Sequence, residues 1–212
     1  MNMTIKGTLI VVDVQLDFCE AGALEVPRGG EVVKVINRCS MQFEHIVATQ
    51  DWHPADHASF ASLYPGKKPY DVIEAPYGKQ VLWPDHCVQA SRGAEMHPEL
   101  DVARFELLLR KGFRRDIDSY SAFYENDQKT ATGLAGYLRE RGIERLYFAG
   151  LATDFCVLYS VLDARRLGFS VSVVADACRG IDLDGSLAAA WSAMLRAGAK
   201  RVDSSELSRH TE

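Results

Sequence analysis

The sequence predicts an α/β fold, with a mainly parallel central sheet of about six strands and helices on both faces. Short β-branched and apolar runs alternate along the chain with segments of helical periodicity, which is the pattern of βαβ units. Glycines follow these periodic segments where helix C-caps are expected, at Gly142, Gly168 and Gly198. At 212 residues, the chain is expected to form one domain, 1–212, with a substantial core.

The first half of the chain contains two predicted strands and one long loop region. Residues 8–14 form a β-branched run typical of a strand buried on both faces. Residues 31–43 have helical spacing, and residues 45–49 form a second buried strand. Residues 51–100 are weakly periodic and rich in Pro, Gly, His and aromatic side chains. Because disordered segments are poor in aromatics, we interpret this region as an ordered functional loop.

The second half alternates more regularly. Strands are predicted at 105–110, 145–149, 170–175 and 200–202, and helices at 130–141, 154–167 and 185–197. In parallel sheets of this kind, ligands bind outside the carboxyl ends of the strands. Four reactive residues fall at or just past such ends, so we expect them to converge on one edge: Asp13, Asp51, Lys111 and Cys156.

The composition excludes several classes of function. A net charge of −5 gives no reason to expect nucleic acid or an anionic membrane as a partner, and no apolar run is long enough to span a bilayer. The first residues lack the basic and then apolar build of a secretion signal. Five cysteines without a CxxC pair argue against a disulfide framework, so a reducing, cytoplasmic setting is expected.

Asp13, Lys111 and Cys156 could form a nucleophilic site. A cysteine in the first turn of a helix faces unpaired backbone N–H groups and the positive end of the helix dipole, and both favour the thiolate. A carboxylate can take the thiol proton, and an ammonium can hold the negative charge. The alternative is structural, because buried cysteines often only pack a helix onto a sheet.

Residues 51–100 also offer ligands for a metal ion. Asp51 and His53 are two residues apart in an extended segment, so their side chains point to the same side. His86 follows later in the loop, and two imidazoles with one carboxylate suit Zn²⁺, Fe²⁺ or Mn²⁺ with open water positions. The alternative is that these histidines are hydrogen-bonded surface residues.

Aromatic residues in the neighbouring loops could wall a flat apolar pocket, among them Phe18, Trp83 and Tyr120. They could equally be core residues. The sequence has no GxGxxG, GxxxxGK[ST], GxSxG or HExxH motif, which weakens dinucleotide-binding, NTPase, serine-hydrolase and zincin interpretations.

Five segments, in order, resemble the nicotinamidases of the isochorismatase-like cysteine hydrolase superfamily. They are residues 13–18 (DVQLDF), 49–54 (TQDWHP), 83–87 (WPDHC), 111–112 (KG) and 150–157 (GLATDFCV). The resemblance runs from about residue 8 to 202. It implies an isochorismatase-like, Rossmann-like three-layer fold and hydrolysis of nicotinamide to nicotinate and ammonia in NAD salvage. Hydrolysis of pyrazinamide to pyrazinoate is expected as well.

The resemblance also implies residue roles. Cys156 would attack the carboxamide carbon and form a thioester, Asp13 would carry the proton to the leaving ammonia, and Lys111 would sit between them. The backbone N–H groups of Ala152 and Cys156 would form the oxyanion hole, and the Leu151–Ala152 peptide bond would be cis.

For the cofactor, the resemblance implies one divalent transition metal ion held by Asp51, His53 and His86, with Zn²⁺ as the first candidate and Fe²⁺ or Mn²⁺ as alternatives. The ion would orient the pyridine ring, and Phe18, Trp83 and Tyr120 match positions that line the ring pocket. His57 is left out of the ligand set because its spacing from His53 is short.

Two other functions remain open. One is another hydrolase of the superfamily, of the isochorismatase or N-carbamoylsarcosine amidase type, which needs the cysteine but not the metal loop. The other is a binding module on the same fold, since fold alone does not determine function. The expected partner is a small-molecule substrate, and a homo-oligomer is compatible with the sequence.

Overall fold

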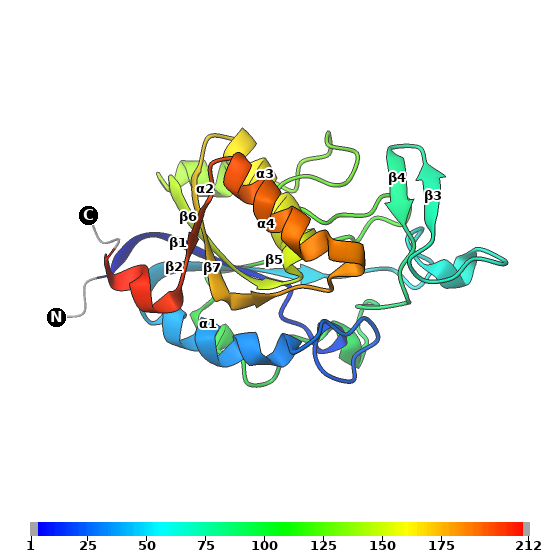
Figure 1. Cartoon of the computed structure of the whole chain (residues 1–212), viewed down its shortest axis with the longest axis horizontal. Helices are drawn as coiled ribbons and strands as arrows, with labels where there is room; N and C mark the ends of the chain where they lie inside the picture. Colours follow the sequence, from blue (N-terminus) through cyan, green and yellow to red (C-terminus); the bar gives the residue numbers. More distant parts are fainter. Residues whose placement is uncertain (1–3, 210–212) are drawn as a thin grey trace.

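A computed structural model describes residues 4–209, so the predicted domain 1–212 extends beyond the described residues at both ends. Six parallel strands form the central sheet in the order β5-β2-β1-β6-β7-β8, which confirms the predicted fold class (Figure 1). The strands are β1 (Ile5–Val12), β2 (Phe43–Asp51), β5 (Leu107–Lys111), β6 (Arg145–Leu151), β7 (Ser170–Arg179) and β8 (Lys200–Val202).

Helices cover both faces of this sheet. Helix α1 (Val32–Ser40) lies on one face, and α2 (Leu134–Glu140), α3 (Leu158–Arg166) and α4 (Ser186–Arg196) lie on the other (Figure 1). Among the described residues, no helix is both long and apolar enough to cross a membrane.

The central strand β1 shows how the sequence specifies this three-layer arrangement. Side chains alternate between the two faces of a strand. Leu9 and Val11 therefore pack into the core beside α1, whereas Ile10 and Val12 pack into the core beneath α2, α3 and α4. All four are completely buried, which explains why the strand is a continuous apolar run rather than an alternating one.

The structure differs from the expected elements in three places. Strand β7 continues to Arg179 instead of stopping at residue 175, because a bulge after Phe148↔Val173 lets pairing with β6 resume at Gly150↔Cys178. Helix α3 is preceded by a π-helical turn, Thr153–Val157, which contains Cys156.

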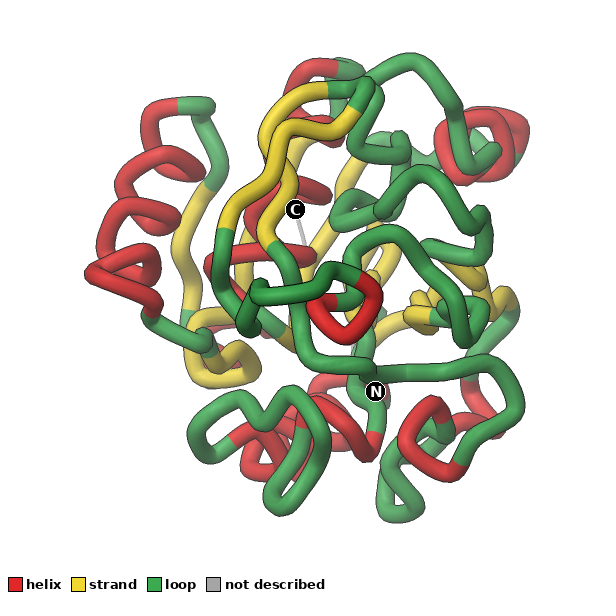
Figure 2. Tube along the Cα trace, turned by 90° about the vertical axis from the view of Figure 1, so that its right-hand side faces the viewer, coloured by secondary structure: helices red, strands yellow, loops and turns green. Residues whose placement is uncertain are grey.

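The third difference lies in the long loop region. It contains an antiparallel hairpin formed by β3 (Val72–Ala75) and β4 (Gly78–Val81). All of its residues except Gln80 are exposed or half-buried, so no continuous apolar face marks it in the sequence. Figure 2 looks at the end of the molecule where the sheet strands finish, and loops cover most of that end.

Candidate active site

Lys111 is the centre of a buried charged cluster at the carboxyl edge of the sheet. It is the last residue of β5 and is 1% exposed. Its Nζ lies 2.9 Å from Asp13 Oδ2, 2.6 Å from Asp51 Oδ1 and 3.4 Å from Cys156 Sγ. Nζ also donates to the carbonyl of Ser119 at 2.9 Å. The structure therefore brings together the four residues that the sequence places at strand ends.

Strand register accounts for this convergence. Asp51 pairs directly with Lys111 across β2 and β5, and Asp13 follows the end of β1. Asp13 has a left-handed backbone (φ 48°), which turns the chain as it leaves the strand. The Thr49 hydroxyl donates to Asp13 Oδ1 at 2.6 Å, and so fixes the carboxylate. Asp13 Oδ2 forms an ion pair with Lys111 Nζ at 2.9 Å, so the second carboxylate oxygen faces the same ammonium as the Cys156 sulfur.

Burial dominates the protonation of this cluster. It raises the pKa of the Cys156 thiol well above its ordinary value, although Lys111 opposes the shift. Burial therefore outweighs the stabilisation of the thiolate that is expected from the start of the helix. Burial also raises the pKa of Asp13 against the pull of Lys111. For Lys111 burial alone would lower the pKa, but Asp13 and Asp51 raise it well above its usual range. A thiol proton and a nearby basic carboxylate are the components of a proton transfer.

Asp51, His53 and His86 form a second cluster beside the first. Asp51 Oδ2 lies 3.2 Å from His53 Nε2 and 3.6 Å from His86 Nε2, and the potential ligand atoms all lie within 4.8 Å of one another. The Nδ1 atoms of the two imidazoles face the carbonyls of Gly112 and Pro84, each at 2.8 Å.

Because a carbonyl can only accept, both Nδ1 atoms carry a proton, and in the neutral imidazoles both Nε2 atoms are left as electron-pair donors. These two nitrogens and the Asp51 carboxylate suit a divalent transition metal ion, and all three side chains are buried. Burial would raise the pKa of Asp51, but the Lys111 ammonium opposes it and the pKa lies well below its ordinary value, so Asp51 is present as the anion that a cation needs.

His57 lies beside this cluster without joining it. Its ring is 4.1 Å from the His53 ring, but its Nδ1 lies 2.7 Å from the Ser59 hydroxyl and its Nε2 lies 3.3 Å from the Ile117 carbonyl. Burial and His53 lower the pKa of His57 to about 4, so it is neutral at physiological pH. Both ring nitrogens thus already have protein partners.

A small cavity opens between the two clusters. It encloses about 320 Å³ counted out to open solvent, and aromatic and apolar side chains make up most of its lining. Phe18, Trp83 and Tyr120 line it as the sequence predicts, together with Ala152 and Cys156. The Leu151–Ala152 peptide bond beside it is cis, as expected.

Sequence reasoning missed several residues of this site. Phe155 lines the cavity and packs edge-on against Trp83, with ring centroids 4.8 Å apart. Asp118 also lines it, although nothing marks a lone aspartate in a loop as a site residue. Leu24 and Ile181 complete the apolar wall.

Gln15 was within reach of sequence reasoning, because it lies two residues after Asp13. It donates to the Asp51 carbonyl at 2.8 Å and accepts from the Asp51 N–H at 2.7 Å. This pair of bonds holds the metal-ligand candidate Asp51 in place through its backbone.

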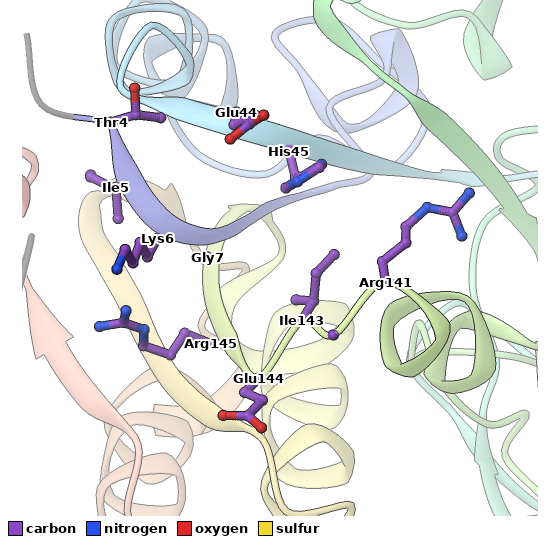
Figure 3. A pocket seen from close by; sticks show the side chains of 11 residues that line it. Thr4, Ile5, Lys6, Gly7, Glu44, His45, Arg141, Ile143, Glu144 and Arg145 are labelled. Carbon is purple, nitrogen blue, oxygen red and sulfur yellow. The ribbon is translucent and has the colours of Figure 1, made fainter.

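A larger pocket lies at the opposite, amino edge of the sheet. It has about 970 Å³ counted out to open solvent and collects side chains from the starts of β1, β2 and β6 (Figure 3). Charged groups there, such as Lys6 and Glu144, project around an open surface rather than converge on one point (Figure 3). The pocket holds none of the sequence-predicted site residues.

Comparisons with known proteins agree with this geometry. The family model described as the isochorismatase domain matches residues 8–206. A nicotinamidase of Acinetobacter baylyi (strain ATCC 33305 / BD413 / ADP1) is 52% identical over 204 residues, which cover 96% of this chain and 95% of the relative.

Solved structures give the same result. The structure of the nicotinamidase/pyrazinamidase of Acinetobacter baumanii has a TM-score of 0.94 at 50% identity, covering 95% of this chain and 98% of that one. PnC1 from L. infantum in complex with nicotinate has a TM-score of 0.83 at 37% identity, with 97% and 98% covered. The pyrazinamidase of Pyrococcus horikoshii in complex with zinc has a TM-score of 0.76 at 34% identity, with 93% and 99% covered.

Proposed function

The chain belongs to the isochorismatase family, and we propose that it is a nicotinamidase, which hydrolyses nicotinamide to nicotinate and ammonia and so serves NAD salvage. The observation that carries the proposal is the position of Lys111 Nζ, which contacts Asp13, Asp51 and Cys156 at once. Lys111 therefore connects the candidate nucleophile, Cys156, and its candidate base, Asp13, with the candidate metal ligand Asp51 beside one small cavity. We extend the proposal to pyrazinamide, a ring of the same size with the same carboxamide.

The proposed reaction begins with proton transfer from the Cys156 thiol to Asp13 Oδ2, while Sγ attacks the carboxamide carbon. The tetrahedral oxyanion would be held by the backbone N–H groups of Ala152 and Cys156, which line the cavity. Collapse breaks the C–N bond, and Asp13 returns the proton to the leaving nitrogen, which departs as ammonia. A nicotinoyl thioester on Cys156 remains.

Hydrolysis of the thioester reverses these roles. Asp13 takes a proton from an attacking water and gives it to Sγ as the C–S bond breaks, which restores the Cys156 thiol. The product acid loses its own proton to solvent and leaves as nicotinate. Lys111 keeps its positive charge throughout, because its neighbouring carboxylates raise its pKa well above the ordinary value against the effect of burial. It stabilises the negative charge that moves between carboxylate, sulfur and oxyanion.

We propose that Asp51, His53 and His86 hold one divalent transition metal ion, zinc first, with Fe²⁺ or Mn²⁺ as alternatives. When bound, the ion supplies a Lewis-acid partner for the pyridine nitrogen, directly or through water, and so orients the ring. Phe18, Trp83 and Tyr120 would hold the ring between apolar surfaces. We place the enzyme in the cytoplasm, since all five cysteines are free and buried.

Purified protein should release ammonia from nicotinamide and pyrazinamide, and far less from benzamide, which lacks the ring nitrogen. Metal analysis of the same sample should give about one transition metal ion per chain. Activity on N-carbamoylsarcosine or isochorismate without activity on nicotinamide would instead assign the chain to another branch of the family. A protein with no hydrolase activity and an unreactive Cys156 would be a binding module.

A further inference from the structure

The β3–β4 hairpin contributes one buried side chain, Gln80. It is 1% exposed, whereas the other residues of the two strands are exposed or half-buried. A buried primary amide has two N–H donors and one carbonyl acceptor to satisfy. The partners of Gln80 therefore show what the hairpin is attached to.

The amide nitrogen of Gln80 reaches two residues of the substrate cavity. Nε2 lies 2.7 Å from Asp118 Oδ2 and 3.1 Å from the Tyr120 hydroxyl oxygen, and also 2.7 Å from the carbonyl of the adjacent Val81. Asp118 and Tyr120 both line the cavity that contains Cys156.

The amide oxygen is held from the opposite side. Gln80 Oε1 accepts from the Tyr77 hydroxyl at 3.1 Å and from Asn126 Nδ2 at 3.3 Å. The oxygen has two donors, and the two N–H groups of the nitrogen are shared among three acceptors, of which the Tyr120 hydroxyl is the most distant. These contacts define the orientation of the amide, because a flipped amide would place its oxygen against the Asp118 carboxylate. Gln80 is thus locked in a single orientation.

Tyr120 depends on this arrangement. Its hydroxyl oxygen accepts from Trp83 Nε1 at 3.0 Å as well as from Gln80, so the two N–H donors define its position. Its ring lies against the Phe155 ring, with centroids 5.8 Å apart. The wall formed by Tyr120, Trp83 and Phe155 is therefore held at its polar end by one amide from the hairpin.

We propose that Gln80 is a positioning residue for substrate recognition. It holds the Tyr120 hydroxyl and the Asp118 carboxylate so that the wall of the cavity fits a single aromatic ring. The inference rests on the proposed nicotinamidase function and adds the hairpin to the residues that determine which substrates bind. None of the described contacts of Gln80 is with Asp13, Lys111 or Cys156, so it acts on binding rather than on the chemical step.

Gln80→Leu tests the proposal, because leucine is of similar size and lacks the amide. We expect KM for nicotinamide to rise about tenfold while kcat stays within about twofold, since an interaction that serves ground-state and transition-state binding equally is removed. The matched control is Lys79→Leu, on the same strand but exposed, which should leave both constants unchanged.

A double-mutant cycle with Tyr120→Phe shows whether the effect passes through the hydroxyl. In the Tyr120→Phe background, Gln80→Leu should raise KM only about threefold, because the part of the effect that passes through the Tyr120 hydroxyl is already lost and only the part through Asp118 remains. Additive effects would overturn the proposal, as would a Gln80→Leu enzyme with the KM of the wild type. A loss of kcat at unchanged KM would also overturn it.

A milder variant covers the case in which Gln80→Leu fails to fold. Tyr77→Phe removes the hydroxyl that donates to Gln80 Oε1 and accepts from the Asp118 N–H, and KM should rise about threefold with kcat unchanged. An unchanged KM in this variant would overturn the proposal. Failure of the proposed function is distinguishable, because then the wild-type protein itself would release no ammonia from nicotinamide.

Discussion

The two edges of the central sheet differ in a way that identifies the functional one. The amino edge has the larger pocket, about 970 Å³ against about 320 Å³ at the carboxyl edge. However, the His45–Glu106 pair near the amino edge remains partly exposed, whereas Asp13 and Lys111 at the carboxyl edge are almost completely buried. Burying charges costs free energy unless they are paired, so a buried cluster of this kind reflects function more directly than pocket volume does.

The largest expected effect belongs to Cys156. Cys156→Ala should reduce kcat for nicotinamide at least about 10⁴-fold, because the nucleophile is lost while the small buried side chain is replaced by a smaller one. Steady-state ammonia release measures the effect, and circular dichroism of the variant should match the wild type. A folded Cys156→Ala protein within tenfold of wild-type turnover would show that the reaction does not depend on Cys156 at the carboxyl edge.

His53→Ala should act on the ion and on binding. Its Nε2 faces Asp51 and its Nδ1 faces the Gly112 carbonyl, so the imidazole is oriented toward the other two candidate ligands. We expect metal content to fall and KM for nicotinamide to rise about 10- to 100-fold. Elemental analysis alongside kinetics checks both, and full metal content in the variant would exclude His53 as a ligand.

Two glycines with the same backbone conformation give a matched pair across the edges. Gly112 (φ +65°) is at the carboxyl edge, and Gly142 (φ +66°) lines the pocket at the amino edge. A Cβ on Gly112 would meet His53 Cε1, whereas a Cβ on Gly142 would meet nothing within 4 Å. Each alanine should destabilise the fold by about 1 kcal/mol from backbone strain.

Only Gly112→Ala should also lower metal content and raise KM, by moving His53. Thermal unfolding measures the loss of stability that backbone strain causes in both variants. Metal analysis measures the loss of bound ion that is expected in Gly112→Ala alone. Equal metal content in both variants would contradict the assigned role of the His53 side chain.

The smallest effect is expected at the amino edge. His45→Ala removes a partly exposed contact of 2.8 Å between His45 Nδ1 and Glu106 Oε2, which should change stability by no more than about 0.5 kcal/mol. Its kcat and KM should equal those of the wild type in the same ammonia assay. A loss of activity in this variant would mean that the larger pocket takes part in function.

The sequence alone was sufficient to predict those parts of the fold and the site that depend on a repeated or local pattern. The parallel sheet follows from apolar runs such as residues 8–14, and the convergence of Asp13, Lys111 and Cys156 follows from their place at strand ends. The sequence was insufficient for features that depend on contacts between distant parts of the chain. The burial that raises the pKa of Cys156 depends on surrounding elements, and Asp118 enters the cavity only because Gln80 and the Ser119 N–H hold its carboxylate.

The hairpin illustrates the same limit. Its strands have no continuous apolar face that would mark them in the sequence, and its one buried residue, Gln80, shows its partners only in three dimensions. The bulge that extends β7 past residue 175 is likewise a matter of pairing with β6, which the β7 sequence does not encode by itself.

A crystal structure of the protein with nicotinaldehyde tests most directly whether Cys156 is the nucleophile, because the thiol can add to the carbonyl carbon of this compound and form a thiohemiacetal. We expect continuous density from Sγ to that carbon, with the ring between Phe18 and Tyr120 and its nitrogen facing Asp51, His53 and His86. Density without a bond to Cys156, or a ring bound at the amino-edge pocket, would contradict this expectation.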